Sequence, residues 1–233
     1  MSENRFQSSA VLARQMADDL ATRIREAIEA RGRVCLAVSG GTTPVQFFEE
    51  LSSRDVDWSK VLITLVDERW VGEDEAASNA RLVREHLLKN NAESAYFLPL
   101  KNKAKNPVDG FMECENKLHE QIRRLDFAVL GMGHDGHTAS WFPESAALSK
   151  CLDESGGAWC CPVTDEPAGL PRMTLTWALL SNCRHLYLHF EGQQKNAVYQ
   201  QALEEEGRTD IQAMPVRTVL TQSQVPLTIF RSE

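Results

Sequence analysis

The sequence lacks the features that mark several classes of protein. No apolar stretch approaches the roughly 20 residues that a membrane-spanning helix needs. The opening MSENRFQSSA has no basic region followed by an apolar run, so no signal peptide is predicted. The six cysteines form neither a CxxC pair nor a zinc-ligand spacing, and Cys35, inside an apolar run, is expected to be a buried thiol. We therefore expect a cytoplasmic protein.

Positive charge is also scarce. Lys and Arg total 25 against 33 Asp and Glu, which gives a formal net charge of -8. A nucleic-acid-binding domain normally carries a basic stripe, and none is visible, so we expect neither a nucleic-acid nor a membrane partner. An anionic small molecule would have to be bound by cations gathered locally against this acidic background.

The 233 residues are 42% hydrophobic and 25% charged, as in an ordinary globular protein. Short apolar runs alternate with amphipathic segments, which predicts an α/β, Rossmann-like three-layer fold whose mainly parallel sheet is covered by helices on both faces. We expect a single domain over 1–233, with a Gly- and Pro-rich irregular lobe or lid at 146–171 and a solvated loop at 204–208. Strands are predicted at 34–38, 61–66, 127–130, 186–190 and 227–230, and helices at about 9–31, 78–88, 108–122 and 195–203.

Two polar segments follow the first two predicted strands, where α/β sheets bind their ligands. The first is SGGTTP, from Ser39 through Gly40, Gly41 and Thr42 to residue 44. Backbone N–H groups of consecutive glycines can approach an anion, although a plain strand-to-helix turn would look the same. The second is the DER loop, in which Arg69 could bind an oxyanion by its fork geometry and Asp67 could orient it.

The third segment, GMGHDGH at 131–137, carries the most chemistry. It matches GxGxxG, but Asp135 would face a pyrophosphate with like charge, and no apolar helix pattern follows before residue 143. Acid–base chemistry suits it better, because a histidine side chain such as that of His137 ordinarily takes a proton near neutral pH. A metal site formed with His134 has no recognised signature to support it.

Lys195, in GxxK after a later strand, could supply a point charge to a phosphate, and Arg172 is a weaker candidate of the same kind. There is no GxSxG nucleophile elbow and no cysteine within a histidine-bearing motif. An activated water is therefore the more economical nucleophile.

Together these segments resemble the 6-phosphogluconolactonase family, which shares its fold with glucosamine-6-phosphate deaminases. The matching stretches run in family order: 39–44, 67–69 with 78–79, GMGHDGHTASWFP at 131–143, 172–176 and 192–195. The resemblance implies hydrolysis of 6-phospho-D-glucono-1,5-lactone in the pentose phosphate route by a monomer or weak homo-oligomer. It implies that His137 activates water with support from Asp135, without a metal or an organic cofactor. The segment 39–42, Arg69, Arg172 and Lys195 would hold phosphate or the developing oxyanion.

Two alternatives and two departures accompany this interpretation. A sugar-phosphate deaminase-isomerase would carry a glutamate where Phe142 stands, and its Asp-Glu-Tyr segment reads Asp-Glu-Arg here. A non-catalytic sugar-phosphate sensor would carry a DNA-binding segment first, and only about nine residues precede the first predicted helix. Trp141 stands where a smaller aliphatic residue is expected, and Gly72 where proline is common; either could alter the shape of the pocket.

Overall fold

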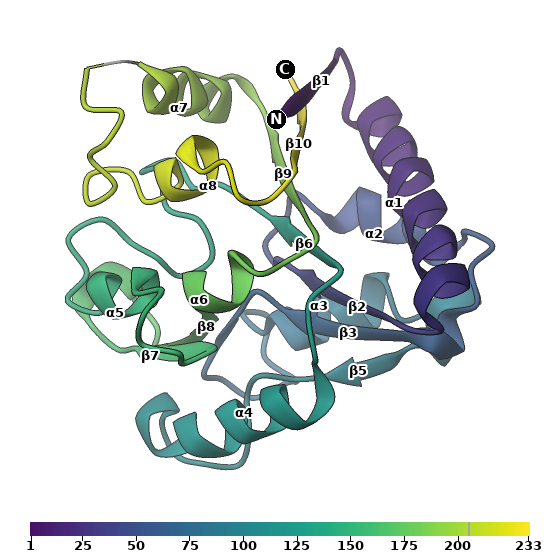
Figure 1. Cartoon of the computed structure of the whole chain (residues 1–233), viewed down its shortest axis with the longest axis horizontal. Helices are drawn as coiled ribbons and strands as arrows, with labels where there is room; N and C mark the ends of the chain where they lie inside the picture. Colours follow the sequence, from purple (N-terminus) through teal and green to yellow (C-terminus); the bar gives the residue numbers. More distant parts are fainter. Residues whose placement is uncertain (205) are drawn as a thin grey trace.

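A computed structural model of the protein describes residues 1–204 and 206–233. The predicted loop at 204–208 therefore includes one residue, Glu205, that lies outside the described residues. A seven-stranded sheet forms the centre of the molecule, and every neighbouring pair in it is parallel (Figure 1). Its order across the sheet is β1 (Ser2–Phe6), β10 (Leu227–Ser232), β9 (His185–Glu191), β6 (Phe127–Leu130), β2 (Val34–Val38), β3 (Val61–Leu65) and β5 (Tyr96–Leu98).

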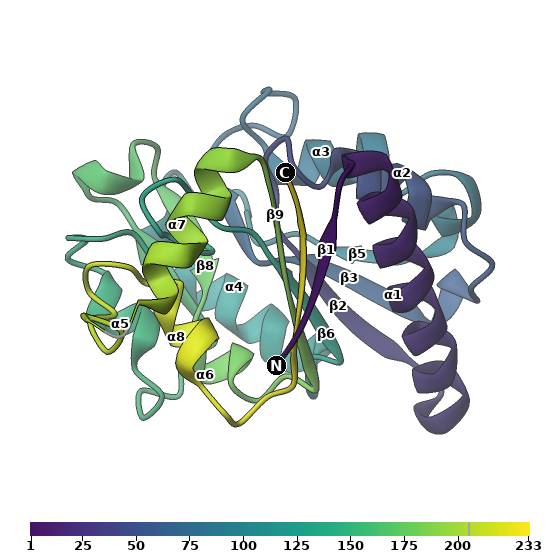
Figure 2. The same cartoon turned by 90° about the horizontal axis from the view of Figure 1, so that it is seen from above.

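Helices cover both faces of this sheet (Figure 2), which confirms the predicted three-layer α/β architecture. One face carries α1 (Ser9–Arg31), α2 (Val45–Ser52) and α3 (Asn79–His86). The other carries α4 (Pro107–Gln121), α6 (Trp177–Leu180), α7 (Gln193–Leu203) and α8 (Arg217–Thr221). Short 3-10 turns lie at Trp58–Lys60, Asn90–Ser94 and Glu166–Ala168.

The first helix begins and ends where its sequence predicts. The Ser8 hydroxyl accepts from the N–H of Val11 at 3.3 Å, and Gly32, at φ 79°, donates its N–H to the Ile28 carbonyl at 2.7 Å. Its apolar side chains recur every fourth residue and are buried against the sheet and α2, each contributing about 1.5–3 kcal/mol relative to exposure. These buried positions include Leu12, Met16, Leu20 and Ile24.

A second, antiparallel sheet was not foreseen in the sequence. It consists of β4 (Asp67–Arg69), β8 (Arg172–Leu175) and β7 (Cys160–Val163), in that order. The prediction that residues 67–69 form a loop is therefore wrong, because they pair with β8 over three residues. The segment 146–171 is less irregular than expected, since it contains α5 (Leu148–Leu152) and β7. That this segment acts as a lid stays a prediction.

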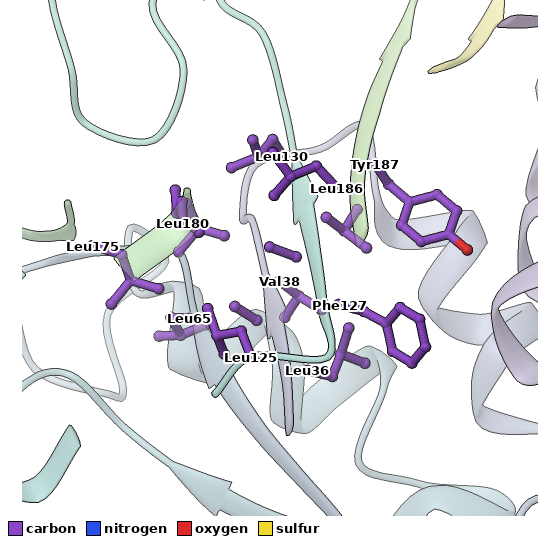
Figure 3. Close-up of a cluster of buried hydrophobic side chains, with 14 of the residues drawn as sticks. Leu36, Val38, Leu65, Leu125, Phe127, Leu130, Leu175, Leu180, Leu186 and Tyr187 are labelled. Atoms are coloured by element: carbon purple, nitrogen blue, oxygen red, sulfur yellow. The ribbon is translucent and has the colours of Figure 1, made fainter. Parts of the chain in front are cut away.

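The core lies on both faces of the central strands (Figure 3). Phe127 and Tyr187 project toward α1, where the Tyr187 hydroxyl donates to Asp19 at 2.6 Å, while Leu175 and Leu180 lie on the opposite side. Burial raises the pKa of the Tyr187 phenol, so this hydroxyl stays a donor. All six cysteines are free and buried, as expected for Cys35.

Candidate active site

The order in which the chain adds strands to the sheet reverses between β2 and β6. From β2 the chain proceeds through β3 to β5 on one side, and then returns to β6, β9 and β10 on the other. The loops that leave the carboxyl ends of β2 and β6 therefore diverge, and ligands of α/β proteins bind in such a crevice. A cavity of about 540 Å³ opens there. Nine of the ten predicted site residues line it: Ser39, Gly40, Gly41, Thr42, Asp67, Arg69, His137, Arg172 and Lys195.

The tenth predicted residue, Asp135, lies directly behind His137. Its Oδ1 is 2.5 Å from Nδ1 of the imidazole and accepts the backbone N–H of His137 at 3.0 Å. Burial raises the pKa of the Asp135 carboxyl, but the side-chain hydrogen bond and charge of His137 outweigh it and hold that pKa at about 2. In the neutral imidazole this carboxylate favours the proton on Nδ1. The other ring nitrogen, Nε2, then carries the free lone pair.

Gly133 makes this arrangement sterically possible. A Cβ at this position would lie 2.2 Å from Nδ1 and Cε1 of His137, and 2.7 Å from Oδ1 of Asp135. The N–H of Gly133 also donates to the carbonyl of His137 at 2.8 Å, which closes the loop on itself. Residue 133 must therefore be a glycine, because the His137 ring packs directly against its Cα.

The Asp67 carboxylate joins β8 to the loop after β6 in the wall of the cavity. Its buried carboxylate accepts from the Ser140 hydroxyl at 2.5 Å and from Nη1 of Arg172 at 3.3 Å, and the Asn79 amide lies 3.3 Å away. The sequence predicts that Asp67 orients Arg69, but the structure pairs it with Arg172, because β4 and β8 lie side by side. Asp67 thus fixes a cation and the loop after β6 at one point.

The backbone of Arg69 is held by the side chain of the preceding residue, Glu68. The buried Glu68 carboxylate accepts the backbone N–H groups of Arg69, Asn79 and Ala80 at 2.7, 2.8 and 2.8 Å. Burial raises the pKa of Glu68, and these three hydrogen bonds oppose the rise. Nη1 of Arg69 donates to the Ala77 carbonyl at 2.7 Å, whereas its buried Nε has no partner among the described residues.

Phe142 supports the base and a cation together. Its ring centroid is 4.6 Å from that of His137, and the Arg172 guanidinium lies 5.0 Å over the same ring. Burial lowers the pKa of Arg172, while the nearby Asp67 carboxylate raises it. An arginine ordinarily titrates above pH 12, so Arg172 acts as a cation.

Lys195 also lines the cavity. It lies in the first turn of α7, after Gly192 at φ 91°, and its Nζ donates to the Thr43 hydroxyl at 3.1 Å. Burial lowers its pKa, and the charge of Glu191 acts in the opposite direction. The ammonium retains two further protons that can be donated to an anion.

The turn after β2 brings backbone close to this site. Gly40 packs so tightly on Asn79 that a Cβ there would lie 1.9 Å from the Asn79 Oδ1, and Gly41 adopts φ 84°. Packing on Asn79 and a positive φ therefore account for the two glycines, and that this turn binds an anion stays a prediction.

Sequence reasoning did not assign roles to four further residues of the wall: Thr43, Asn79, His189 and Glu191. The SN pair at 78–79 and the threonine of SGGTTP were visible as parts of the motifs. His189 gave no signal, because the other residues of the strand predicted at 186–190 are apolar. His134 also lines the cavity.

Neither departure from the expected pattern reaches the cavity wall. Trp141 is buried, donates its indole N–H to the Leu175 carbonyl at 3.0 Å and meets Trp177 edge-on. Gly72 lies outside the lining residues as well. Across residues 1–204 and 206–233, no group of three or more His, Cys, Asp or Glu side chains is arranged to hold a metal ion. No helix in the same ranges has the length and apolarity to cross a bilayer.

The family described as glucosamine-6-phosphate isomerases/6-phosphogluconolactonase matches residues 7–228. The chain belongs to this family. A 6-phosphogluconolactonase of Rhizobium meliloti is 42% identical over 225 residues, covering 97% of this chain and 96% of the relative. A Pseudomonas aeruginosa protein of the same name is 41% identical over 222 residues, covering 95% and 91%.

Structural comparison agrees with this membership of the isomerase/lactonase family. A crystal structure of a 6-phosphogluconolactonase from Shewanella baltica superposes with a TM-score of 0.95 at 44% identity, covering all of this chain and 98% of the other. A putative 6-phosphogluconolactonase from Neisseria gonorrhoeae gives a TM-score of 0.90 at 33% identity, with both chains covered in full. The seven-stranded α/β fold thus matches the fold of these two structures.

Proposed function

We propose that the chain hydrolyses 6-phospho-D-glucono-1,5-lactone to 6-phospho-D-gluconate in the pentose phosphate pathway, with His137 as the general base. The names of its relatives support the reaction. One observation carries the mechanism: an imidazole backed by a carboxylate at 2.5 Å stands in a cavity that also holds two arginines and a lysine. The substrate is accordingly an anionic, phosphorylated sugar lactone.

In this mechanism Nε2 of His137 takes a proton from water while the water oxygen bonds to the lactone carbonyl carbon. The carbonyl π electrons move onto oxygen, and the resulting oxyanion is stabilised by cationic or N–H donors of the wall. When the carbonyl re-forms, the bond to the ring oxygen breaks, and the proton held by His137 passes to that oxygen. Asp135 stabilises the imidazolium between these steps, because it is already ionised.

The remaining wall residues hold the charged ends of the substrate. Ser39, Thr42 and the glycines between them offer backbone and hydroxyl donors beside the Lys195 ammonium. Arg69 and Arg172 line the same cavity, on β4 and β8. Asp67 acts by fixing Arg172 and Ser140, so its contribution to catalysis is to orient these groups.

The deaminase-isomerase alternative is less well supported. Aldose–ketose isomerisation moves a proton between neighbouring carbons and needs a further acid–base group, whereas Phe142 presents an apolar ring at the position concerned. A non-catalytic sugar-phosphate sensor would have no use for the Asp135–His137 pair. A cytoplasmic location and a monomeric or weakly self-associating state complete the proposal.

The reaction is tested with lactone generated in situ and with acid release followed against an uncatalysed blank, because this lactone also opens by itself. We expect the protein to exceed the blank by orders of magnitude and to leave glucosamine 6-phosphate unchanged. Turnover of glucosamine 6-phosphate with no lactonase rate above the blank would instead favour the deaminase alternative.

A further inference from the structure

The imidazole of His137 is held from two directions by two different residues. Asp135 contacts it at Nδ1, and the ring of Phe142 packs against it, with the two ring centroids 4.6 Å apart and the planes inclined by 46°. The Asp135 side chain is half-exposed, whereas Phe142 is buried. The hydrogen bond restrains the imidazole at one atom, so contact with a buried ring is the second restraint on its orientation.

The segment that leads to Phe142 is attached to β8 at two successive residues. The N–H of Ser140 donates to the Thr174 hydroxyl at 3.1 Å. The indole N–H of Trp141 donates to the Leu175 carbonyl at 3.0 Å. These four residues are buried, so their hydrogen bonds are shielded from competing water. Phe142 follows directly in the chain, and its place is therefore set by the second sheet.

The backbone between the base and this attachment adopts a conformation that is unfavourable by itself. Ala139 has φ 51°, in the left-handed region that residues with a side chain rarely adopt. Such a conformation persists only where the surrounding structure fixes it. The bonds of the next two residues to β8 supply that constraint, so the course of the chain from His137 to Phe142 is fixed.

Arg172 also lies against Phe142, but it has other partners. Its guanidinium is 5.0 Å from the centroid of the ring. Nη1 donates to the Asp67 carboxylate at 3.3 Å, and Nε donates to the Ala168 carbonyl at 3.1 Å. These two hydrogen bonds do not involve the ring, whereas the imidazole of His137 has one among the described residues, at Nδ1. Loss of the ring should therefore affect the base more than the cation.

We propose that Phe142 is a positioning residue for the base: its ring, placed by β8, keeps Nε2 of His137 directed at the attacking water. Phe142 is not among the described residues that line the cavity, so it acts through His137 rather than on the substrate. The second sheet thereby takes part in orienting the base. This inference rests on the proposed function, because it requires His137 to activate water.

Phe142→Leu, which removes the ring but keeps an apolar side chain, tests the inference. Its kcat should fall by about 10- to 100-fold, since a misplacement of about 1 Å can cost about 10² in rate. Its affinity for the stable product, 6-phospho-D-gluconate, should stay within about threefold of wild type in titration calorimetry, because uniform binding is retained. The calorimetric stoichiometry gives the fraction of binding-competent protein. Expressing kcat per competent site separates misplacement of the base from partial unfolding.

Two further variants serve as controls. Phe142→Tyr retains the ring and should recover most of the lost kcat. Phe97→Leu removes a ring from β5 that also lies 5.0 Å from a guanidinium, that of Arg84, but is outside the described lining of the cavity; it should keep the wild-type kcat.

Three results would overturn the inference: a wild-type kcat per competent site in Phe142→Leu, a Phe142→Tyr variant no faster than Phe142→Leu, or a product affinity that falls as much as kcat. Failure of the proposed function is seen separately. It would appear as a wild-type protein no faster than the uncatalysed blank, or as a His137→Ala variant with the wild-type rate.

Discussion

The imidazole of His137 is held by one oxygen of Asp135 through two contacts, at 2.5 Å to Nδ1 and at 3.0 Å to the backbone N–H of the same residue. The two residues are separated by Gly136, whose φ of 80° turns the chain back on itself. One carboxylate oxygen thus sets the ring orientation, the tautomer and the local backbone. The base is oriented before any substrate binds.

Asp135→Asn should lower kcat by about 10²-fold, because an amide no longer stabilises the imidazolium formed in the transition state. KM should change much less, since the carboxylate is not among the residues lining the cavity. The matched control is Asp153→Asn, which changes an exposed carboxylate that likewise accepts a backbone N–H two residues on, from Ser155 at 2.8 Å. Equal kcat for the two variants would remove Asp135 from the mechanism.

Gly133→Ala should reduce kcat severely, by about tenfold or more, since a methyl group at 2.2 Å from the imidazole must displace the base and a 1 Å misplacement can cost about 10² in rate. Gly131→Ala, in the same loop, is the comparison: its Cβ would meet Ser39 Oγ at an ordinary 3.6 Å, so its loss should be much smaller. Steady-state kinetics on both variants, with circular dichroism to verify folding, decide the matter. Similar losses would mean that the loop tolerates no side chain for reasons unrelated to His137.

Lys195→Ala should chiefly weaken selection for the phosphorylated lactone. A hydrogen bond to a charged group contributes about 1.5–3 kcal/mol, which corresponds to roughly 10- to 100-fold in kcat/KM. The measured quantity is the ratio of kcat/KM for 6-phosphogluconolactone to that for gluconolactone. If the variant retained the wild-type ratio, Lys195 would not be a phosphate ligand.

Glu68→Ala should destabilise the fold by about 3 kcal/mol, because it leaves buried N–H donors at the start of α3 and in β4 without partners. Glu73→Ala removes an exposed carboxylate that pairs with Arg84, and such surface pairs contribute about 0–1 kcal/mol. The free energies of unfolding in urea give the comparison. A Glu68 variant as stable as the Glu73 variant would mean that Glu68 does not organise this region.

The parallel sheet and its helices could be predicted because their signals are local. A short window of sequence is enough to predict each of these elements. The apolar run at 34–38 predicts a buried strand, and an apolar residue at every fourth position predicts a helix, as at Leu12, Met16, Leu20 and Ile24. The same applies to the chemistry of the loop after β6, where Asp135 and His137 lie two residues apart. Because the carboxyl ends of parallel strands lie at one edge of the sheet, the loops that follow these strands could also be predicted to lie close together.

The second sheet could not be predicted, because its pairing is distant and its sequence is untypical. Arg69 lies opposite Arg172, more than a hundred residues away, and a three-residue charged strand shows no alternation of apolar and polar side chains. The partner of Asp67 was missed for the same reason. β1 could not be predicted because it is an edge strand of mostly polar residues. The role of His189 could not be predicted because its partner, Glu191, lies beyond the apolar part of β9.

The central claim is that the neutral imidazole of His137 activates water, and kcat/KM of wild type and His137→Ala as a function of pH tests it most directly. Histidine side chains ordinarily lose their proton near pH 6.5, whereas the pKa of Asp135 is about 2, so Asp135 is ionised throughout the range. Wild-type activity, after subtraction of spontaneous hydrolysis, should rise with pH as the base loses its proton. His137→Ala, still folded by circular dichroism, should lose about 10²–10⁴-fold and with it the dependence on pH. A flat wild-type profile, or a variant that keeps the wild-type rate, would contradict the account.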